Sequence, residues 1–324
     1  MATIKDVAER AGVAKETVSR VLNNRGYISE ETRDKVYRAM EELHYTPNAF
    51  AQGLSKKNMD SIAVVVPHIN HPFFAAMISG IEHEARERGY KMFLYHSNGE
   101  PEQEGRILQL CQSSFISGVL LFSAEISAEI MARYNIPIIL IEREAVSGAY
   151  SIQSDNKLGG KLAADYLLQS GRRDLLVIGA RNHGHMPGDI RAAEFVRICG
   201  EAGVECHTYL STPGQYQDME HQELIEQALN EHPGADGIFA TSDVIGAQVL
   251  QVCHDRRIKV PKQIRIVGFD DVSTARLTYP RLTTIHQPIR EMARKAMEAV
   301  DAIQAGGTFS PLTILPVTLV KRET

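Results

Sequence analysis

The fold of the N-terminal part is decided by the stretch Thr3-Ile-Lys-Asp-Val-Ala-Glu-Arg-Ala-Gly-Val-Ala-Lys-Glu-Thr-Val-Ser-Arg-Val-Leu-Asn23. We expect a short helix over residues 6–11, with Thr3 or Asp6 near its start, where hydroxyl and carboxylate groups cap well. Gly12 ends this helix, because glycine tolerates a positive φ. A second helix follows over residues 15–24. Two short helices joined by a glycine-containing turn predict a helix-turn-helix.

A third helix is predicted over residues 30–43, because Ser29 is a favourable N-cap. The three helices carry apolar residues that can form one small core. These residues are Val7, Ala8, Val13, Val18, Val21, Leu22, Val36, Ala39, Met40 and Leu43. The sequence therefore predicts an all-α head.

The second helix also presents a polar outward face. Its residues are Lys15, Glu16, Thr17, Ser19, Arg20 and Asn23. Such donors and acceptors suit the base edges of a DNA major groove, where Arg20 can bind guanine bidentately and Glu16 can accept from cytosine. The alternative is an ordinary solvated face on a small helical domain.

Charge is distributed unevenly along the chain. The 324 residues carry a formal net charge of −5. Residues 1–60 hold ten Lys and Arg against nine Asp and Glu, whereas the rest holds 25 against 31. A weakly basic head on an acidic body permits DNA binding by the head alone, but charge does not establish it.

The remainder of the chain alternates apolar runs with amphipathic segments. The runs cover residues 62–66, 92–95, 119–122, 136–141, 175–178, 237–240 and 264–269, and the helical patterns cover 73–89, 102–113, 128–134, 158–170, 190–202, 220–230 and 244–256. Alternating strands and helices predict parallel sheets with helices on both faces. About 260 residues of this pattern suit an α/β body of two doubly wound parallel-sheet lobes better than one.

Several classes of protein are disfavoured. The longest apolar runs, such as residues 136–141, fall far short of the about 18 residues that span a bilayer, and the N-terminus has no signal-peptide pattern. The four cysteines have no CxxC spacing, so we expect a reduced, cytoplasmic protein. No GxSxG or HExxH occurs, and the Gly179–His185 spacing lacks the lysine of a phosphate loop. We therefore expect no enzyme, no cofactor and no metal site.

Three segments in order resemble the lactose repressor (LacI/GalR) family of bacterial transcription regulators. Thr3–Asn23 resembles its N-terminal signature, residues 45–54 (Tyr-Thr-Pro-Asn-Ala-Phe-Ala-Gln-Gly-Leu) its hinge, and residues 266–271 with 282–288 its regulatory domain. The resemblance implies a periplasmic-binding-protein-like body. The implied domains are a helix-turn-helix head at 1–45, a hinge at 46–60, an N-terminal lobe at 61–157 and 288–316, and a C-terminal lobe at 158–287 and 317–324.

The resemblance also implies which residues contact DNA. They are Thr3, Lys15, Glu16, Thr17, Ser19, Arg20, Asn23, Asn48, Ala51 and Leu54. Leu54 matches a leucine that wedges between base pairs, which bends the duplex. Gly53 departs from the family pattern, because glycine costs roughly 1 kcal/mol in a helix interior.

A small effector is expected in the cleft between the lobes, at the carboxyl ends of the strands. The resemblance implies that the effector-binding residues are Phe73, Phe74, Glu142, Arg191, Tyr216, Ser242 and Asp270. Aromatic rings can stack on a sugar or a base, and the arginine suits a polar ligand. Pure core packing is the alternative for Phe73. The basic loop at 181–188 can hold an anionic group or simply be an exposed loop.

These expectations combine into one function, a cytoplasmic, ligand-responsive transcription regulator that represses sugar-utilisation genes. Its partners are a palindromic operator DNA, a sugar or sugar phosphate effector and a second copy of the chain, with no membrane. No leucine heptads follow Leu315, which favours a dimer. The alternatives are a nucleobase-responsive regulator of the same family and a solute-binding protein.

Overall fold

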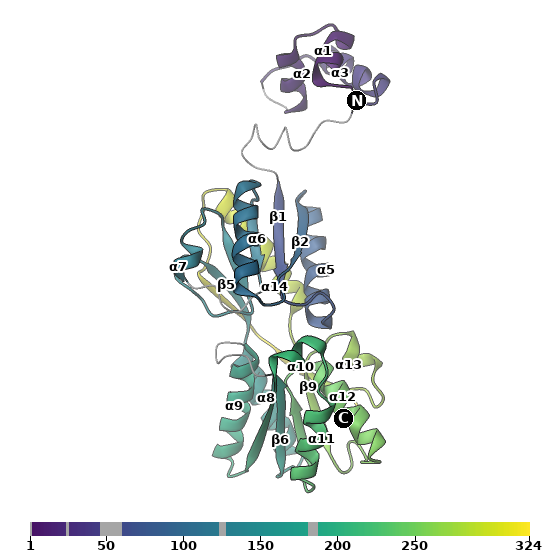
Figure 1. Cartoon of the computed structure of the whole chain (residues 1–324), viewed down its shortest axis with the longest axis vertical. Coiled ribbons are helices and arrows are strands. Elements are labelled where there is room, and N and C mark those ends of the chain that lie inside the picture. The colour runs from purple at the N-terminus through teal and green to yellow at the C-terminus, as the bar shows by residue number, and fades with distance from the viewer. Residues whose placement is uncertain (1, 24–25, 46–59, 123–127, 181–186) are drawn as a thin grey trace. The chain divides into compact units, whose positions relative to one another are not determined.

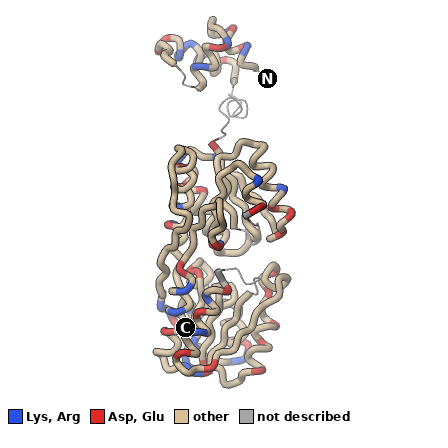
Figure 2. Tube along the Cα trace, turned by 90° about the vertical axis from the view of Figure 1, so that its left-hand side faces the viewer, with Lys and Arg blue, Asp and Glu red and all other residues tan. Residues whose placement is uncertain are grey.

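The computed structural model describes residues 2–23, 26–45, 60–122, 128–180 and 187–324. The chain divides into two compact units, Met1–Asp60 and Ser61–Thr324 (Figure 1). Acidic and basic residues occur in both units (Figure 2).

The first unit contains three helices, α1 (Ile4–Ala11), α2 (Lys15–Leu22) and α3 (Glu30–Glu42). Thr3 is the N-cap of α1 in a reciprocal capping box with Asp6, and Gly12 ends the helix at a φ of 67°. The Ser29 side chain accepts a hydrogen bond from the Thr32 N–H at 3.3 Å at the start of α3. The predicted starts of α2 and α3 and the glycine turn are therefore confirmed, whereas α1 begins at Ile4, two residues before the predicted start.

The predicted apolar residues of the head form one core. Val7, Val18 and Val36 are completely buried, one from each helix. The other members of the core belong to the same predicted set, together with Ile4, Ala11, Ile28 and Tyr45. A core of this size explains how so short a segment folds as a separate unit.

A six-stranded parallel sheet forms the first lobe of the second unit, with the strand order β11-β5-β4-β3-β1-β2. Its strands are β1 (Ser61–Val66), β2 (Lys91–His96), β3 (Gly118–Leu121), β4 (Ile138–Ile141), β5 (Tyr150–Ser154) and β11 (Leu312–Leu315). The helices of this lobe are α5 (Pro72–Glu87), α6 (Pro101–Ser113), α7 (Ala128–Met131) and α14 (Ile289–Gln304).

A second six-stranded sheet has the order β12-β10-β9-β8-β6-β7. Its strands are β6 (Leu175–Ala180), β7 (Cys206–Ser211), β8 (Gly237–Ala240), β9 (Arg265–Asp270), β10 (Thr283–His286) and β12 (Thr318–Val320). The helices of this lobe are α8 (Asn156–Gln169), α9 (Pro187–Glu201), α10 (Pro213–Asp218), α11 (Gln222–Glu231), α12 (Asp243–Asp255) and α13 (Ser273–Leu277). β12 runs antiparallel to β10 at the edge of this sheet, whereas the other neighbouring strands pair in parallel.

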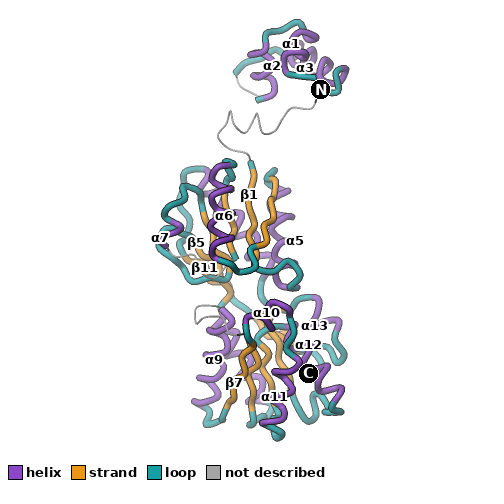
Figure 3. Tube along the Cα trace, viewed as in Figure 1, coloured by secondary structure: helices purple, strands orange, loops and turns teal. Residues whose placement is uncertain are grey.

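Both faces of the first sheet are covered by helices (Figure 3). Ile62, Val64 and Val66 of β1 pack with α5 and α14, whereas Ala63 and Val65 pack in a second cluster with α6. Successive side chains of a strand point to opposite faces, so a continuous apolar strand indicates burial on both. The predicted fold class, a helical head and two doubly wound lobes, is confirmed.

Some elements were not predicted. The omitted strands are β5, β7, β10, β11 and β12, and the omitted helices are α10, α13 and α14. β10 reads as polar (Thr-Thr-Ile-His), yet Thr283 and Thr284 are completely buried. The Thr283 hydroxyl donates to the Thr324 carbonyl at 2.8 Å, which satisfies it inside the fold. The helix expected at 128–134 also ends earlier, at Met131.

Candidate functional site

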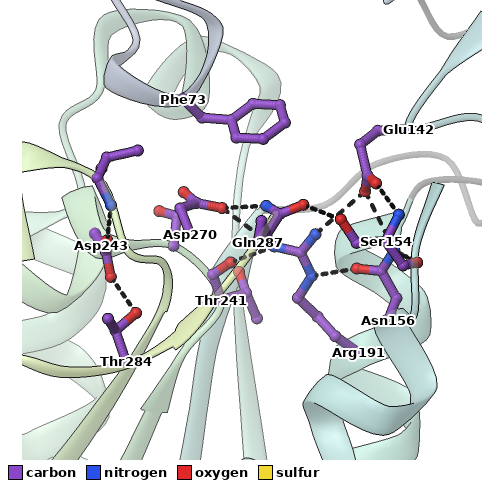
Figure 4. A network of polar contacts seen from close by, with 12 residues as sticks. Phe73, Glu142, Ser154, Asn156, Arg191, Thr241, Asp243, Asp270, Thr284 and Gln287 are labelled. Carbon is purple, nitrogen blue, oxygen red and sulfur yellow. Dashed lines mark hydrogen bonds and ion pairs between the residues drawn. The ribbon is translucent and has the colours of Figure 1, made fainter. Parts of the chain in front are cut away.

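A buried polar cluster of the second unit surrounds Arg191 of α9, which is only 6% exposed (Figure 4). Its Nε donates to Asn156 Oδ1 at 2.9 Å, and its Nη1 donates to the Thr241 carbonyl at 3.0 Å. The guanidinium carbon lies 3.5 Å from the centroid of the Phe269 ring, which supports it by a cation–π contact. The arginine is thereby held rigidly at the carboxyl end of the sheet.

Two carboxylates face this arginine. Glu142 Oε2 lies 3.7 Å from Arg191 Nη2, and Asp270 Oδ1 lies 3.7 Å from Nη1. Burial lowers the pKa of Arg191, although both acids oppose that shift. Burial raises the pKa of Asp270 to about 7, against the opposing influence of Arg191 and of a hydrogen bond from Gln287. The cluster thus contains two acids and one arginine, and both carboxylates lie beyond hydrogen-bond distance of the guanidinium.

Both acids stand at the ends of strands in strained backbone. The φ of Glu142 is 53° after β4, and that of Asp270 is 117° at the end of β9. Such conformations cost about 1–3 kcal/mol each and are concentrated at binding and catalytic sites. Both of these strained residues belong to the cluster around Arg191.

The carboxylates are linked by a chain of hydrogen bonds. Gln287 Nε2 donates to Asp270 Oδ1 at 2.6 Å, and the Ser154 hydroxyl donates to Gln287 Oε1 at 2.5 Å. The Ser154 N–H then donates to the Glu142 carboxylate. This chain joins the end of β5 to the segment after β10, and so connects the two lobes (Figure 4).

Aromatic rings form the opposite wall. Phe73 and Phe74 of α5 are each 7% exposed, and their ring centroids lie 5.4 Å apart. Phe122 lies 5.8 Å from Phe74, and burial raises the pKa of Tyr216 to about 12, which keeps its phenol neutral. Both Phe73 and Phe74 also belong to the first lobe's core. Core packing and lining of the cavity are therefore combined in the same two residues.

A cavity of about 90 Å³ lies among these groups. It is lined by His71, Phe73, Phe74, Phe122, Ile141, Glu142, Ala180, Arg191, Tyr216, Thr241, Ser242, Ile245, Asp270 and Gln287. The structure thus brings together all seven residues that the sequence singled out for an effector. Pockets for drug-sized ligands begin at about 300 Å³, so this one suits a small ligand.

Supporting side chains hold the cavity wall in place. The Ser242 side chain accepts from the Ile245 N–H as the N-cap of α12. His71 Nδ1 accepts from the Phe73 N–H at 3.3 Å, and burial lowers the pKa of His71 to about 4, so its ring is neutral. Asp243 accepts from the Val272 N–H at 2.9 Å and from the Thr284 hydroxyl at 2.5 Å. Burial raises its pKa well above the ordinary value.

Sequence reasoning missed Ser154, Asn156, Thr241 and Gln287. Thr241 follows β8, and Gln287 follows β10, so both obey the rule that strand ends form the site. The signal for Thr241 was present, because its strand was predicted. Ser154, Asn156 and Gln287 were hidden, because β5 and β10 were not predicted.

The head presents a second candidate site on α2. Lys15, Glu16, Ser19, Arg20 and Asn23 line one surface groove. Thr17 is half-buried beside them. The Asn23 amide donates to the Ser19 carbonyl at 2.8 Å, so part of its hydrogen-bonding capacity serves the end of α2. A helix face with such donors and acceptors has the chemistry needed to read base edges.

Thr3 occupies a different position, at the start of α1. Its hydroxyl donates to Asp6 Oδ2 at 2.9 Å within the capping box. Asn48, Ala51 and Leu54 lie outside the described residues, and so does most of the loop at 181–188. Within the part of the chain that the structure describes, no helix combines the length and apolar character that crossing a bilayer requires.

A helix-turn-helix unit followed by a two-lobed α/β unit with a polar cavity defines a class, the ligand-responsive DNA-binding regulators. Residues 3–48 match the family model of bacterial regulatory proteins of the lacI family, and residues 164–324 match that of a periplasmic binding protein-like domain. The chain is 32% identical to the ribose operon repressor of Bacillus subtilis (strain 168), over 100% of this chain and 98% of that protein. The chain therefore belongs to the lacI family of bacterial regulatory proteins.

Other relatives and solved structures agree with this assignment. The chain is 30% identical to the HTH-type transcriptional repressor PurR of Serratia proteamaculans, over 91% of this chain and 88% of that protein. A periplasmic binding protein/LacI transcriptional regulator from Alkaliphilus metalliredigens, complexed with D-xylulofuranose, matches at 30% identity with a TM-score of 0.74, over 82% of this chain and 98% of that one. The lac repressor dimer bound to operator has a TM-score of 0.89 over 100% of this chain and 98% of that one, and at 23% identity it supports the fold.

Proposed function

We propose that this chain is a transcriptional repressor that binds operator DNA through its head and a small sugar through the cavity of its second unit. The observation that carries the proposal is the Arg191–Glu142–Asp270 cluster facing aromatic rings, in a chain that also has a helix-turn-helix. Relatives named as ribose and sucrose operon repressors support the sugar. We assign effector contacts to Phe73, Phe74, Glu142, Arg191, Tyr216, Ser242 and Asp270.

The charge of the cavity favours a neutral ligand over a phosphorylated one. Among the described residues that line it, Arg191 is the one arginine or lysine, and it faces two acids. A phosphate would bring about two more negative charges into a buried site that is already acidic. Sugar hydroxyls instead can donate to the carboxylates and accept from the arginine. The cavity volume of about 90 Å³ further disfavours a disaccharide.

Purines are the second candidate, and the aromatic wall is the observation that favours them. Phe73, Phe74 and Tyr216 offer ring faces on which a flat base can stack. A relative is also named as the repressor PurR. A nucleobase offers fewer hydroxyl groups to satisfy two carboxylates, so we rank it below a sugar.

We assign DNA contact to Thr3 at the start of α1 and to the polar face of α2 and its end, which consists of Lys15, Glu16, Thr17, Ser19, Arg20 and Asn23. We also assign it to Asn48, Ala51 and Leu54 of the hinge. Two copies of the chain would place two α2 helices in successive major grooves of a palindromic site, as helix-turn-helix dimers do. A solved relative is the lac repressor dimer bound to operator. A regulator of operons works where bacterial DNA lies, so we place the chain in the cytoplasm and assign it no catalytic activity.

The proposed regulation depends on the two lobes of the second unit. We assign residues 61–157 and 288–316 to one lobe and residues 158–287 and 317–324 to the other, with head and hinge at 1–45 and 46–60. Effector binding between the lobes would change their relative angle and thereby the spacing of the two hinges. Coupling between two sites through two global states is what allostery requires.

A ligand screen tests the cavity. Thermal unfolding of the purified chain is measured with ribose, sucrose, ribose 5-phosphate and adenine, in the wild type, in Asp270→Asn and in Asp255→Asn, an exposed control on α12. We expect ribose to raise the melting temperature of the wild type and of the control but not of Asp270→Asn. A response to ribose 5-phosphate or adenine alone would refute the neutral-sugar assignment, and an equal response in Asp270→Asn would refute the site.

A DNA-binding measurement tests the head. Palindromic duplexes are selected from a random pool with the wild-type chain, and affinities are then compared for Arg20→Ala and for Arg38→Ala, an exposed arginine of α3 outside the α2 groove. A bidentate arginine–guanine pair contributes about 1–3 kcal/mol, so Arg20→Ala should bind about 5- to 150-fold more weakly. Equal losses in both variants would contradict base reading by Arg20.

A further inference from the structure

Three side chains that are far apart in sequence meet at the opposite end of the second sheet. Asp174 precedes β6, His207 lies in β7, and His232 follows α11. One ligand atom from each lies within 4.8 Å of the others, and all three side chains are half-buried. No metal site is expected from the sequence, and these three residues come together only in the fold.

The two imidazoles are held in place by their surroundings. Their ring centroids lie 3.7 Å apart at an interplanar angle of 20°, and the Tyr209 ring packs edge-on to His232 at 5.9 Å. His207 belongs to β7, whose register with β6 pairs it with Leu176. The backbone of His232 makes two hydrogen bonds. Its N–H donates to the Ala228 carbonyl, and its carbonyl accepts from the Ala235 N–H.

The backbone of Asp174 is also held by hydrogen bonds. The Asp174 N–H donates to Asp236 Oδ1 at 3.1 Å, and its carbonyl accepts from the Asp236 N–H at 2.9 Å. A Cβ at position 234 would lie 3.0 Å from Asp174 Oδ2, so Gly234 leaves room for the carboxylate. Three ligands on three separately anchored segments lose little conformational freedom when they bind an ion, which favours binding.

The local charge favours a cation. Glu205 Oε1 lies 3.8 Å from His207 Nε2 and is within reach as a fourth ligand. Glu231 precedes His232 and accepts from the Tyr209 hydroxyl. The neighbouring arginines are engaged elsewhere, since Arg172 donates to the Pro261 carbonyl and Arg173 donates to the Leu168 carbonyl.

We propose that Asp174, His207 and His232 form a binding site for a divalent transition-metal ion of the Zn²⁺ class. Two imidazole nitrogens and one carboxylate are a ligand set that zinc takes at about 2.0–2.2 Å, with water or Glu205 in the fourth position. Ligand atoms around a tetrahedral ion lie about 3.4 Å apart, so the stacked rings must tilt toward a common point. Mg²⁺ and Ca²⁺ prefer oxygen ligands and bind weakly here.

The proposed ion would connect β6, the edge strand β7 and the turn before β8. Asp174 stands before the first residue of β6, whereas Ala180, the last residue of that strand, lines the cavity described above. The metal site is therefore at the far end of the sheet from the effector cavity. Its role is to stabilise the second lobe, and it does not depend on the proposed effector.

Metal binding is tested on the full chain without an affinity tag, after treatment with a chelator. Zn²⁺ is titrated in competition with a chromophoric chelator, with Mg²⁺ as the comparison, in the wild type, His207→Gln, His232→Gln and the control His254→Gln, an exposed histidine of α12. We expect one tight Zn²⁺ equivalent in the wild type and the control, and an affinity at least about tenfold lower in the other two variants. The melting temperature should rise with Zn²⁺ in the wild type and stay unchanged in His232→Gln.

Further variants separate this site from other ligands. Cys206→Ser removes a neighbouring thiol, and the double variant His183→Gln/His185→Gln removes two other histidines, which lie outside the described residues. Both should retain the Zn²⁺ equivalent, and Co²⁺ should give its tetrahedral visible absorption in them and lose it in Asp174→Asn. Loss of Zn²⁺ in either of these two variants, equal affinity in His232→Gln, or no binding by the wild type would overturn the proposal.

Discussion

Replacing Gly160 by alanine should damage both the stability and the ligand site, because α8 and α9 cross closely at this glycine. A Cβ at position 160 would lie 2.3 Å from the Arg191 carbonyl oxygen and 3.1 Å from the Glu194 Cβ. Real Cβ atoms do not approach other atoms to less than 3.0 Å, so α9 must move by about 0.7 Å. The contact involves backbone, which cannot rotate away as a flexible side chain can.

The magnitude follows from what this shift would disturb. Overpacking costs about 1–3 kcal/mol. Asn156 lies on α8 and accepts from Arg191 Nε on α9 at 2.9 Å, so the same movement stretches this bond toward about 3.6 Å, where it no longer counts as a hydrogen bond. Losing a bond to a charged donor costs about 1.5–3 kcal/mol, and the better helix propensity of alanine returns about 1 kcal/mol. We expect a net loss of about 2–5 kcal/mol.

Gly200 provides the matched control, because it lies in α9 and a Cβ at this position would meet nothing within 4 Å. Gly200→Ala should leave the free energy of unfolding unchanged or raise it by up to about 1 kcal/mol. Urea unfolding followed by circular dichroism compares the two variants with the wild type, and the ligand screen then reports on Arg191. Equal stability of Gly160→Ala and Gly200→Ala would refute the close crossing of α8 and α9.

Two further predictions concern Asp270 and Thr3. The folded-state pKa of Asp270, about 7, lies above the ordinary value of 3.8, so the folded state holds a proton that the unfolded state has lost. The contribution of Asp270 to the free energy of unfolding should therefore fall as pH rises between about 4 and 7, and Asp270→Asn should remove this contribution, which urea unfolding of the variant and the wild type at about pH 5 and about pH 8 measures. A profile of unchanged slope would contradict the shift. Thr3→Ala removes the capping box of α1 and should lower the stability of the head by about 1 kcal/mol in a thermal melt, with the second unit unaffected; an unchanged head transition would show that the cap is dispensable.

The elements that the sequence predicted are those whose local pattern and burial agree. β1 is apolar at five consecutive positions, and all of its residues are buried on two faces. β7 reads Cys-His-Thr-Tyr-Leu-Ser and lies at an edge, so its mixed pattern matched neither template. α14 was missed although Met292, Ala296 and Val300 recur at helical spacing and are all buried. The signal for α14 was in the sequence, whereas that for β7 depended on its neighbours.

The residues of the candidate site likewise differ in whether the sequence could predict them. Arg191, Glu142 and Asp270 were identified in advance, from their resemblance to a family and from their positions after predicted strands. The link through Ser154 and Gln287 was not, because it depends on bringing β5 beside the segment after β10. No local pattern encodes a contact between residues 133 positions apart. The same limit hid the group of Asp174, His207 and His232.

In the proposed effector site, the incomplete satisfaction of Arg191 would equip the cavity for a ligand. A fully formed buried ion pair would place carboxylate oxygens at about 2.7–2.9 Å from the guanidinium, whereas both acids lie at 3.7 Å. The two short hydrogen bonds from Arg191 go to an amide and a carbonyl, which fix its position without neutralising its charge. A buried charge without close pairing is costly. A polyhydroxylated ligand that inserts between the acids and the arginine would recover part of this cost, and that recovered energy is available to favour the ligand-bound arrangement of the lobes.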